Sequence, residues 1–176
     1  MQIDDFKKIK LLVLDVDGVL TEGSIIYDNK DREWKIFNVY DGLGIFLLSK
    51  MGVDTVLVSA KKSSILGKRA KDMKIKEVIG GILPKKKIVN YLMKKYKVKK
   101  EEICFVGDDL IDLSIMKEVG FPVAVKNASS EVKKQAVYIT KKEGGKGAVR
   151  EVVELILKAK NLWKKVVKEV DSLLSE

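Results

Sequence analysis

The 176-residue chain has no histidine and a single cysteine, Cys104. Without histidine, every mechanism that relies on an imidazole base, metal ligand or pH switch is excluded. One cysteine cannot form an intrachain disulfide, and the N-terminal MQIDDFKKIK lacks the apolar core of a signal peptide, so we expect a cytoplasmic protein. No apolar run approaches the length of a membrane-spanning helix, so we expect no membrane association.

Aromatic residues are also scarce, at 7% of the chain, whereas 35 basic residues against 25 acidic ones give a net charge of +10. Such a charge makes nucleic acids, anionic lipids and anionic metabolites candidate partners. Lysines spread over helix faces, as in PKKKIVNYLMKKYKVKKEE, are however typical of solvated surface, and these runs hold no cluster of aromatic residues for base stacking. We therefore do not expect nucleic-acid binding.

Short apolar runs such as LLVL alternate with helical patterns along the chain. The expected strands are residues 9–14, 53–58, 77–79, 103–106, 123–125 and 137–139. The expected helices are residues 41–51, 63–73, 84–96, 109–119, the segment SSEVKKQA, and one long helix over 147–174. Residues 23–38 are expected to form a β-hairpin, because GSIIY and WKIFNV flank the turn-forming DNKD.

This alternation predicts a single α/β domain over residues 1–176, for which the chain length and a hydrophobic content of 46% are suitable. We expect a Rossmann-like three-layer sandwich, with a mostly parallel sheet and helices on both of its faces. The hairpin of residues 23–38 would form a small flap beside it.

Polar side chains follow three of the expected strands. Asp15 follows the first strand, Ser59 the second, and Asp108 with Asp109 follow ICFVG. Each alone is commonly a turn residue or a helix cap, but ligands of parallel sheets bind beyond the carboxyl ends of the strands. Carboxylates that meet there repel unless a cation lies among them, and hard oxygen ligands favour Mg²⁺ over zinc or copper.

The ordered combination of these motifs resembles the haloacid dehalogenase-like hydrolase superfamily. Its four motifs are DVDGVLT at residues 15–21, VSA with Ser59, a lysine that opens a later helix, and GDDLID at residues 107–112. The resemblance implies a Mg²⁺-dependent phosphatase whose catalytic lysine is Lys85. The adjacent Lys86 and Lys87 leave that assignment open by one position.

The roles of the motif residues follow from the same resemblance. Asp15 is the expected nucleophile, and Asp17 is expected to protonate the leaving alcohol and then activate water. Ser59 and Lys85 would hold the phosphoryl group that is transferred. The expected metal ligands are Asp15, the backbone carbonyl of Asp17, and Asp108. Asp109 and Asp112 would support the metal or orient Lys85.

The spacing of the motifs leaves no room for a cap domain. Residues 18–58 number 41 and residues 60–84 number 25, and the expected hairpin, helices and strand occupy them. An open crevice gives a leaving group little to bind and exposes the intermediate to water. We therefore expect neighbouring subunits to supply the missing walls.

Within the superfamily, the chain resembles the capless 3-deoxy-D-manno-octulosonate 8-phosphate (KDO 8-phosphate) phosphatases over nearly its whole length. The segments that carry this resemblance are FNVYDGLGI, VGDDLIDL, FPVAVKNA and GGKGAVREVVELIL. It implies a homotetramer whose hairpins and carboxyl tails complete adjacent active sites. It also implies substrate contacts from Asn38, Val39, Asp41, Gly42, Arg69 and Lys85.

The chain departs from that family where arginines are usual. Tyr40 replaces the arginine of NVRDG, Phe46 stands at another common arginine, and Ala60-Lys61 replaces Gly-Arg. A lysine does not reproduce the bidentate carboxylate recognition of a guanidinium group. Either Lys61 or Arg150 is left to meet the carboxylate of the substrate.

We therefore predict hydrolysis of a sugar-acid phosphate through an aspartyl-phosphate, with KDO 8-phosphate as the substrate and lipopolysaccharide precursor synthesis as the pathway. One alternative is a related nine-carbon, sialic-acid-like 9-phosphate. Another is a non-catalytic regulatory module of the same fold.

Apolar residues in the segment 147–174 recur at alternating spacings of three and four, which is the heptad pattern. They are Val149, Val152, Ile156, Ala159, Trp163, Val166, Val170 and Leu173. Packing on the sheet accounts for residues 149–156. We predict that residues 163–174 pack against another subunit.

Overall fold

One parallel sheet forms the centre of the molecule. Within residues 3–30 and 32–173, which the computed structural model describes, six strands join in the order β5-β4-β1-β6-β7-β8, and each neighbouring pair is parallel. The strands are β1 (Leu11–Leu14), β4 (Asp54–Ser59), β5 (Glu77–Gly80), β6 (Ile103–Gly107), β7 (Phe121–Ala124) and β8 (Tyr138–Ile139). The predicted Rossmann-like fold is confirmed.

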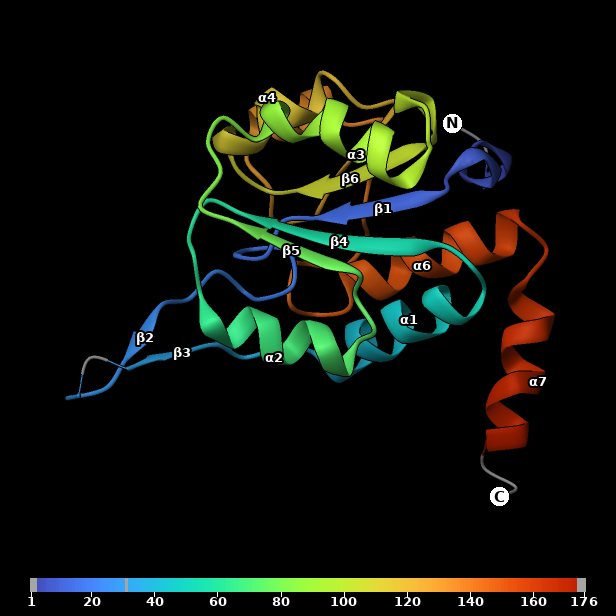
Figure 1. The fold of residues 1–176 in the computed structure, drawn as a ribbon, viewed down its shortest axis with the longest axis horizontal. Helices are drawn as coiled ribbons and strands as arrows, with labels where there is room; N and C mark the ends of the chain where they lie inside the picture. The colour runs from blue at the N-terminus through green and yellow to red at the C-terminus, as the bar shows by residue number, and fades with distance from the viewer. Residues whose placement is uncertain (1–2, 31, 174–176) are drawn as a thin grey trace.

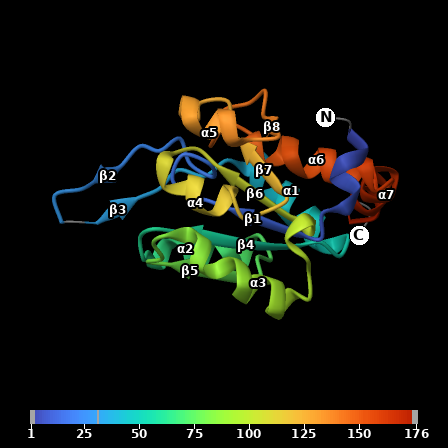
Figure 2. The ribbon, with the colours of Figure 1, turned by 90° about the horizontal axis from the view of Figure 1, so that it is seen from above.

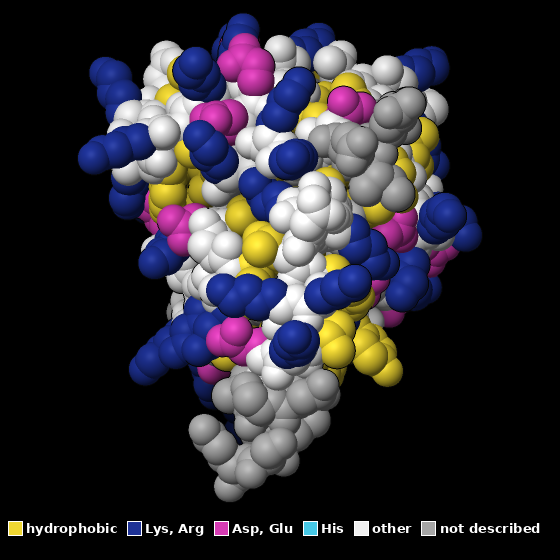
Figure 3. Space-filling view, turned by 90° about the vertical axis from the view of Figure 1, so that its right-hand side faces the viewer, with side chains coloured by type: hydrophobic (Ala, Val, Ile, Leu, Met, Phe, Trp, Pro, Cys, Tyr) yellow, Lys and Arg dark blue, Asp and Glu magenta, His cyan; other side chains and the backbone are white. Residues whose placement is uncertain are grey.

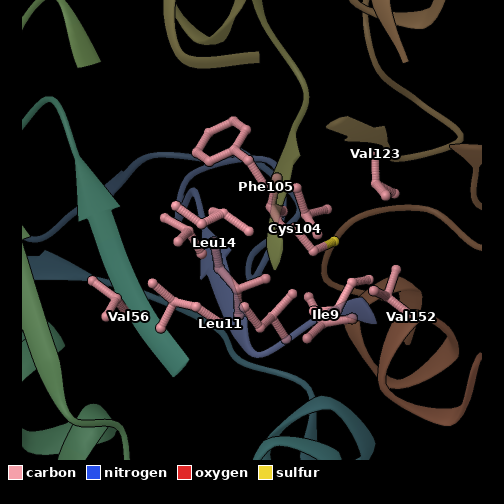
Figure 4. Close-up of a cluster of buried hydrophobic side chains, with 14 of the residues drawn as sticks. Ile9, Leu11, Leu14, Val56, Cys104, Phe105, Val123 and Val152 are labelled. Carbon is pink, nitrogen blue, oxygen red and sulfur yellow. The ribbon is translucent and has the colours of Figure 1, made fainter. Parts of the chain in front are cut away.

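The core explains why β1 is apolar at every position. All four residues of LLVL are buried, because helices cover both faces of the sheet. Val13 is paired with Val56 of β4 on one side and with Phe105 of β6 on the other. Figure 4 shows these three strands contributing to one cluster, which Val152 joins from the helix below the sheet. Each such fully buried aliphatic side chain contributes roughly 1.5–3 kcal/mol to folding.

The helices form two layers around this sheet. They are α1 (Val39–Lys50), α2 (Ser64–Asp72), α3 (Val89–Tyr96), α4 (Leu113–Met116), α5 (Ser130–Gln135), α6 (Ala148–Ala159) and α7 (Trp163–Leu173). Helices α1, α2 and α6 lie on one face and α3 and α4 on the other, while α5 lies beside α4 (Figures 1 and 2). Short 3₁₀ turns are η1 (Ile3–Lys8), η2 (Lys85–Ile88), η3 (Lys100–Glu102) and η4 (Leu110–Asp112).

The predicted hairpin is confirmed as a separate antiparallel pair, β2 (Ile26–Tyr27) with β3 (Glu33–Trp34). It projects from the body on the side toward which the arrows of β1 and β6 point (Figure 1). A second view shows the same projection beyond the layers of the sandwich (Figure 2). The hairpin therefore extends from the end of the sheet where the carboxyl ends of these strands lie.

The predicted single helix over residues 147–174 is wrong. Helix α6 ends at Ala159, and Asn161 has a φ of 58°, in the left-handed region that asparagine tolerates better than most residues. Helix α7 then begins at Trp163 and takes a different direction (Figure 1). The heptad seam is therefore divided between two helices.

The beginning of α7 packs on its own chain. Val166 is buried in the core, and the ring of Trp163 lies 5.6 Å from the guanidinium carbon of Arg150 and 5.2 Å from Nζ of Lys158. Trp163 and Val166 thus have contacts within their own subunit, and the packing of residues 163–174 against another subunit stays a prediction. Leu174, the last residue of the predicted segment, lies outside the described residues.

The surface shows how the excess of basic residues is distributed. Figure 3 views the end of the molecule that carries both chain termini, where Lys and Arg side chains are spread among acidic and apolar ones. On this face the basic residues form no single stripe of the kind that tracks a nucleic-acid backbone. None of the helices in the described part of the chain is both long and apolar enough to cross a membrane.

Candidate active site

The carboxyl ends of β1, β4 and β6 bring the predicted motif residues to one edge of the sheet. Asp15 directly follows β1, and its backbone N–H donates to the carbonyl of Val106 at 3.0 Å. Ser59 ends β4, and Asp108 directly follows β6. These side chains line a pocket of about 290 Å³, near the lower end for small-ligand sites. Its lining residues are Asp15, Asp17, Gly23, Ile25, Glu33, Lys35, Ser59, Ala60, Lys61, Asp108, Asp109 and Ile111.

Lys85 forms the charged centre beneath this pocket. Its side chain is 0% exposed, and Nζ lies 2.6 Å from Oδ1 of Asp15 and 2.6 Å from Oδ1 of Asp112. Burial alone would lower the pKa of Lys85, but the two carboxylates outweigh it and raise the pKa. Lys86 and Lys87 are exposed, so the structure selects Lys85 from the three lysines that the sequence left open.

Asp112 is a buried organiser of the site. One carboxylate oxygen pairs with Lys85, and the other accepts hydrogen bonds from the backbone N–H groups of Asp108 at 2.9 Å and Asp109 at 3.3 Å. It therefore fixes both the lysine and the turn that carries Asp108. Asp109 is exposed, lines the pocket, and caps η4 by accepting from the N–H of Leu110. Of the two predicted supporting residues, Asp112 is the one that orients Lys85.

Asp15, Asp108 and Asp112 form a cluster suited to a cation. One oxygen from each lies within 4.8 Å of the others. Burial raises the pKa of Asp108 to about 8, with further contributions from Asp15 and Asp112, and burial and Asp112 raise the pKa of Asp15 to about 6 against the opposing effect of Lys85. Among the described residues, the buried Oδ1 of Asp108 has no hydrogen-bond partner. An all-oxygen donor set with an unsatisfied buried carboxylate fits Mg²⁺.

The side-chain cluster differs in one member from the predicted ligand set. Asp17, whose backbone carbonyl is the third predicted ligand, contributes no side-chain oxygen to the cluster found among the described residues. Asp112 takes part instead, although its two oxygens already accept from Lys85 and from backbone N–H groups. Asp15 and Asp108 are therefore the predicted ligands whose side chains come together.

The turn after β1 needs glycine for a steric reason. Gly18 has a φ of 91°, and a side chain there would overlap the carboxylate of Asp108. Gly144 packs equally tightly, because a Cβ at that residue would overlap the carbonyl of Gly18. The N–H of the adjacent Gly145 donates to the carbonyl of Val19 at 2.9 Å. The GGKG segment therefore packs against the turn after β1 that contains Gly18.

Ser59 and Lys61 form another wall of the pocket. Ser59 is buried, and its Oγ accepts a hydrogen bond from the N–H of Lys61 at 3.1 Å. The exposed side chain of Lys61 lines the pocket, whereas Arg150 does not. The Nε of Arg150 instead donates to Glu154 at 2.9 Å. Of the two cations considered for the substrate carboxylate, Lys61 is the one placed at the pocket within a single subunit.

Asn38 and Asp41, predicted to bind substrate, act as helix caps within this chain. Oδ1 of Asn38 accepts from the N–H of Tyr40 at 2.8 Å at the start of α1, while Nδ2 donates to the carbonyl of Gly145 at 3.2 Å. Asp41 is buried and accepts from the N–H groups of Gly147 and Arg150 at the start of α6. Burial raises the pKa of Asp41, and these N–H groups oppose the rise.

The remaining predicted substrate contacts also lie outside the pocket lining. Nη2 of Arg69 donates to the carbonyl of Asn38 at 3.3 Å, and the guanidinium group lies over the ring of Phe37. A Cβ at Gly42 would overlap this guanidinium group, so a larger residue there would displace the side chain of Arg69. Val39 is largely exposed. These residues connect α1, α2 and α6 rather than surround the pocket of the same subunit.

Lys35 is a pocket residue that the sequence reasoning missed. Its Nζ lies 2.5 Å from Oδ1 of Asp17 and 3.0 Å from Oε1 of Glu33. For the segment around it, the sequence pattern predicts only a strand of the hairpin. The segment EWKI could have indicated this position, because successive side chains of an extended chain point to opposite sides. Trp34 and Ile36 are exposed, so Lys35 between them points inward, to the pocket.

Known proteins are similar to this chain in sequence and in overall fold. A family model for haloacid dehalogenase-like hydrolases matches residues 52–152. The KDO 8-phosphate phosphatase of Yersinia pestis is 38% identical over 153 residues, which cover 87% of this chain and 82% of that protein. The chain therefore belongs to the haloacid dehalogenase-like hydrolases. Within them, its relatives are the KDO 8-phosphate phosphatases, as the motifs predict.

Solved structures agree with this assignment. The KDO 8-phosphate phosphatase of Moraxella catarrhalis, in complex with a magnesium ion, a phosphate ion and KDO, is 38% identical with a TM-score of 0.92, covering 96% of this chain and 97% of that one. The cobalt-bound deoxy-D-mannose-octulosonate 8-phosphate phosphatase of Haemophilus influenzae is 37% identical with a TM-score of 0.85, covering 89% and 92%.

Proposed function

We propose that this protein is a cytoplasmic, Mg²⁺-dependent phosphatase that hydrolyses KDO 8-phosphate to KDO and phosphate for lipopolysaccharide precursor synthesis. The observation that carries the proposal is the buried Asp15–Lys85–Asp112 group, which lies beside Asp108 under a small pocket that Asp17 and Ser59 also line. The relatives named above support the substrate, and the complex of the Moraxella enzyme supports the metal.

The metal would be held by Asp15, Asp108 and the backbone carbonyl of Asp17. When bound, Mg²⁺ supplies positive charge that offsets the repulsion between a carboxylate nucleophile and an anionic phosphate. Lys85 adds a fixed positive charge from below, and its two carboxylate partners hold it in place. Asp15 would thus serve both the cation and Lys85, whereas Asp112 holds Lys85 and the turn that carries Asp108.

In the first step, an oxygen of Asp15 attacks phosphorus and the bond from phosphorus to the sugar oxygen breaks. Asp17 gives its proton to that leaving oxygen, which departs as the alcohol. Ser59 and Lys85 would hold the phosphoryl oxygens during the transfer. The product on the protein is an aspartyl-phosphate at Asp15.

In the second step, water attacks phosphorus and the bond from phosphorus to Asp15 breaks. Asp17, now a carboxylate, takes a proton from the attacking water and is thereby returned to its starting state. Inorganic phosphate leaves with Asp15 regenerated. Both steps need Asp17 near the sugar-facing side of the pocket, where its side chain is 41% exposed.

The carboxylate of the sugar acid would be met by Lys61, which is exposed at the pocket. A single lysine recognises a carboxylate with less geometric selectivity than a guanidinium group, so a nine-carbon sugar-acid 9-phosphate is the second candidate substrate. A non-catalytic regulatory role is disfavoured, because Asp15, Asp17 and Asp108 are all in place at the pocket.

Assembly into a homotetramer completes the proposal. Within one subunit, Asn38, Val39 and Arg69 lie outside the lining of the pocket. The hairpin presents exposed Trp34 and Ile36, which are suited to contact with a second copy of the chain. A neighbouring hairpin would supply the wall that a capless enzyme lacks.

Phosphate release across a panel of substrates tests this function. The panel contains KDO 8-phosphate, a nine-carbon sugar-acid 9-phosphate and simple sugar phosphates, each with Mg²⁺ and with a chelator. We expect KDO 8-phosphate to be preferred and activity to need Mg²⁺. Asp15→Asn should lower kcat by at least about 10³-fold, since the nucleophile is lost.

Asp72→Asn is the matched control, because Asp72 is an exposed aspartate at the end of α2, away from the pocket lining. It should leave kcat unchanged. If Asp15→Asn hydrolyses as fast as the wild type, the catalytic assignment is wrong. If simple sugar phosphates are hydrolysed as well as the sugar-acid phosphates, the substrate assignment is wrong.

A further inference from the structure

Lys35 makes an unusual contact between the hairpin and the catalytic turn. Its side chain is 4% exposed, although lysine is almost never fully buried unless it is paired. It is paired twice, with Asp17 on the catalytic turn and with Glu33 in β3. Removing a lysine from water is costly, and here both carboxylates offset that cost. The contact is therefore specific rather than a flexible surface ion pair.

The Asp17 carboxylate depends on this contact. In the part of the chain that the structure describes, Lys35 is the only hydrogen-bond or ion-pair partner of that carboxylate. The Asp17 side chain is 41% exposed, so without this contact other rotamers would be open to it. Lys35 thus determines where the carboxylate of Asp17 lies in the pocket.

We infer that Lys35 is a positioning residue for Asp17, holding it where it exchanges a proton with the leaving sugar oxygen and then with water. This inference rests on the proposed phosphatase function and adds to it a part for the hairpin. Because Glu33 holds Lys35 from within β3, the place of Asp17 is set by the hairpin as well as by the sheet. A loss of this contact should therefore reduce the rate of chemistry more than the binding of substrate.

Lys61 provides the comparison within the same pocket. Both lysines line it, but Lys61 is exposed and Lys35 is enclosed by two carboxylates. An exposed lysine is available to an anionic substrate, whereas Lys35 is already neutralised. If Lys35 simply bound substrate, its removal would raise KM and leave kcat unchanged.

The test replaces Lys35 by methionine, which keeps most of the side-chain length and removes the charge. With KDO 8-phosphate and Mg²⁺, we expect kcat of Lys35→Met to fall roughly 10- to 100-fold while KM stays within about threefold, as for a lost positioning contact. Lys94→Met is the matched control, since Lys94 is exposed on α3 and absent from the pocket lining. It should behave as the wild type.

The leaving group gives a second, mechanistic readout. p-Nitrophenol leaves without protonation, whereas a sugar alkoxide needs the proton of Asp17. In the first turnover, Lys35→Met should release p-nitrophenol from p-nitrophenyl phosphate at the wild-type rate and cleave the sugar phosphate slowly. Equal slowing of both would mean that Lys35 acts on the phosphoryl group and not through Asp17.

Chemical rescue separates positioning from a folding defect. Lys35→Cys, treated with 2-bromoethylamine, regains a side chain with an amine at nearly the length of lysine. The other cysteine, Cys104, is fully buried, so the reaction is directed to the new site. We expect treated Lys35→Cys to recover most of the lost kcat, and treated wild type to be unchanged. An absence of recovery would contradict the inference.

Crystal structures of the wild type and Lys35→Met test the inference without an activity measurement. The inference expects the carboxylate of Asp17 to leave its wild-type position in the variant. If Asp17 stays in place, the inference is overturned, even where the enzyme is active. If the wild type hydrolyses no phosphate ester, the proposed function fails, and the crystal comparison still determines whether Lys35 positions Asp17.

Discussion

The floor of the pocket is a buried group of charged side chains, whereas the hairpin beside it exposes apolar side chains. At the floor, Asp15, Lys85 and Asp112 are buried and satisfy one another's charges on elements that pack against the sheet. On the hairpin, apolar Trp34 is 55% exposed and Ile36 is 68% exposed. The charged group at the floor is thus fixed by the fold of one chain, whereas these apolar side chains of the hairpin remain largely exposed.

This difference shows which functions a single chain of this size can complete. A parallel sheet places its strand ends without help, so the carboxylates and the lysine are positioned as a consequence of folding. A hairpin of two short strands has little stability of its own and must be held by contacts. Lys35 is one such contact, and a second subunit would provide the rest.

The largest effect is expected when the positive charge of Lys85 is removed from the floor of the pocket. Lys85→Met leaves Asp15 and Asp112 buried without their cation, which should lower the free energy of unfolding by about 3–5 kcal/mol and abolish activity. Urea unfolding of the metal-free protein measures the stability. Lys86→Met, at the exposed neighbour, should change neither quantity. Comparable stability of the two variants would show that the floor is not a charge-coupled unit.

A smaller effect is expected from pH, through the raised pKa values of Asp15, about 6, and Asp108, about 8. Both lie above the ordinary value of 3.8, so the folded metal-free protein binds protons that the unfolded chain releases. The stability that this provides is complete below the ordinary pKa and is lost as pH rises through about 6 and then about 8. Thermal unfolding of the metal-free protein across that range should show the decline.

Adding Mg²⁺ gives a second test of the same two carboxylates. Because the cation replaces the lost protons, its stabilising effect on the melting temperature should be larger near pH 9 than near pH 6. Asp108→Asn removes one repelling carboxylate and one ligand. It should therefore flatten the pH dependence of the metal-free protein and reduce the response to Mg²⁺. A response to Mg²⁺ that is the same at both pH values would argue against the buried carboxylates as its site.

The smallest effect on stability is expected at the hairpin. Trp34→Ser and Ile36→Ser change exposed side chains, so the free energy of unfolding of one subunit should move by no more than about 0.5 kcal/mol. The oligomer should nevertheless dissociate, as sedimentation would show, and kcat/KM for KDO 8-phosphate should fall with it. Val137→Ser is the control, because Val137 is similarly exposed just before β8. An unchanged oligomer would remove the hairpin from the proposed interface.

Much of the floor could be predicted from the sequence, because its signals are local. LLVL and ICFV each precede acidic residues, and parallel strands bring such ends together whatever the rest of the chain does. The break between α6 and α7 could not be predicted, because the heptad spacing continues through Asn161 although the backbone does not. The spacing of apolar residues does not show whether one residue between them, here Asn161, has a left-handed backbone conformation.

The roles of Asn38, Asp41 and Lys35 depend on contacts between distant segments. Asn38 and Asp41 cap helices that begin more than a hundred residues apart, which only the folded chain reveals. Lys35 sits among surface-like residues, and its inward position follows from the strand alternation and not from its type. The motifs therefore predicted which residues meet at the pocket and left open what holds them there.

The close approach of Gly144 to the carbonyl of Gly18 has a consequence for biosynthesis. The turn that follows Asp15 is translated among the first residues, yet the segment that packs on it emerges from the ribosome only after most of the polypeptide has been made. A nascent chain that stops before Gly144 already holds Asp15, Asp17 and Asp108 and still lacks this cover. The turn therefore reaches its packed state only once translation has passed residue 145.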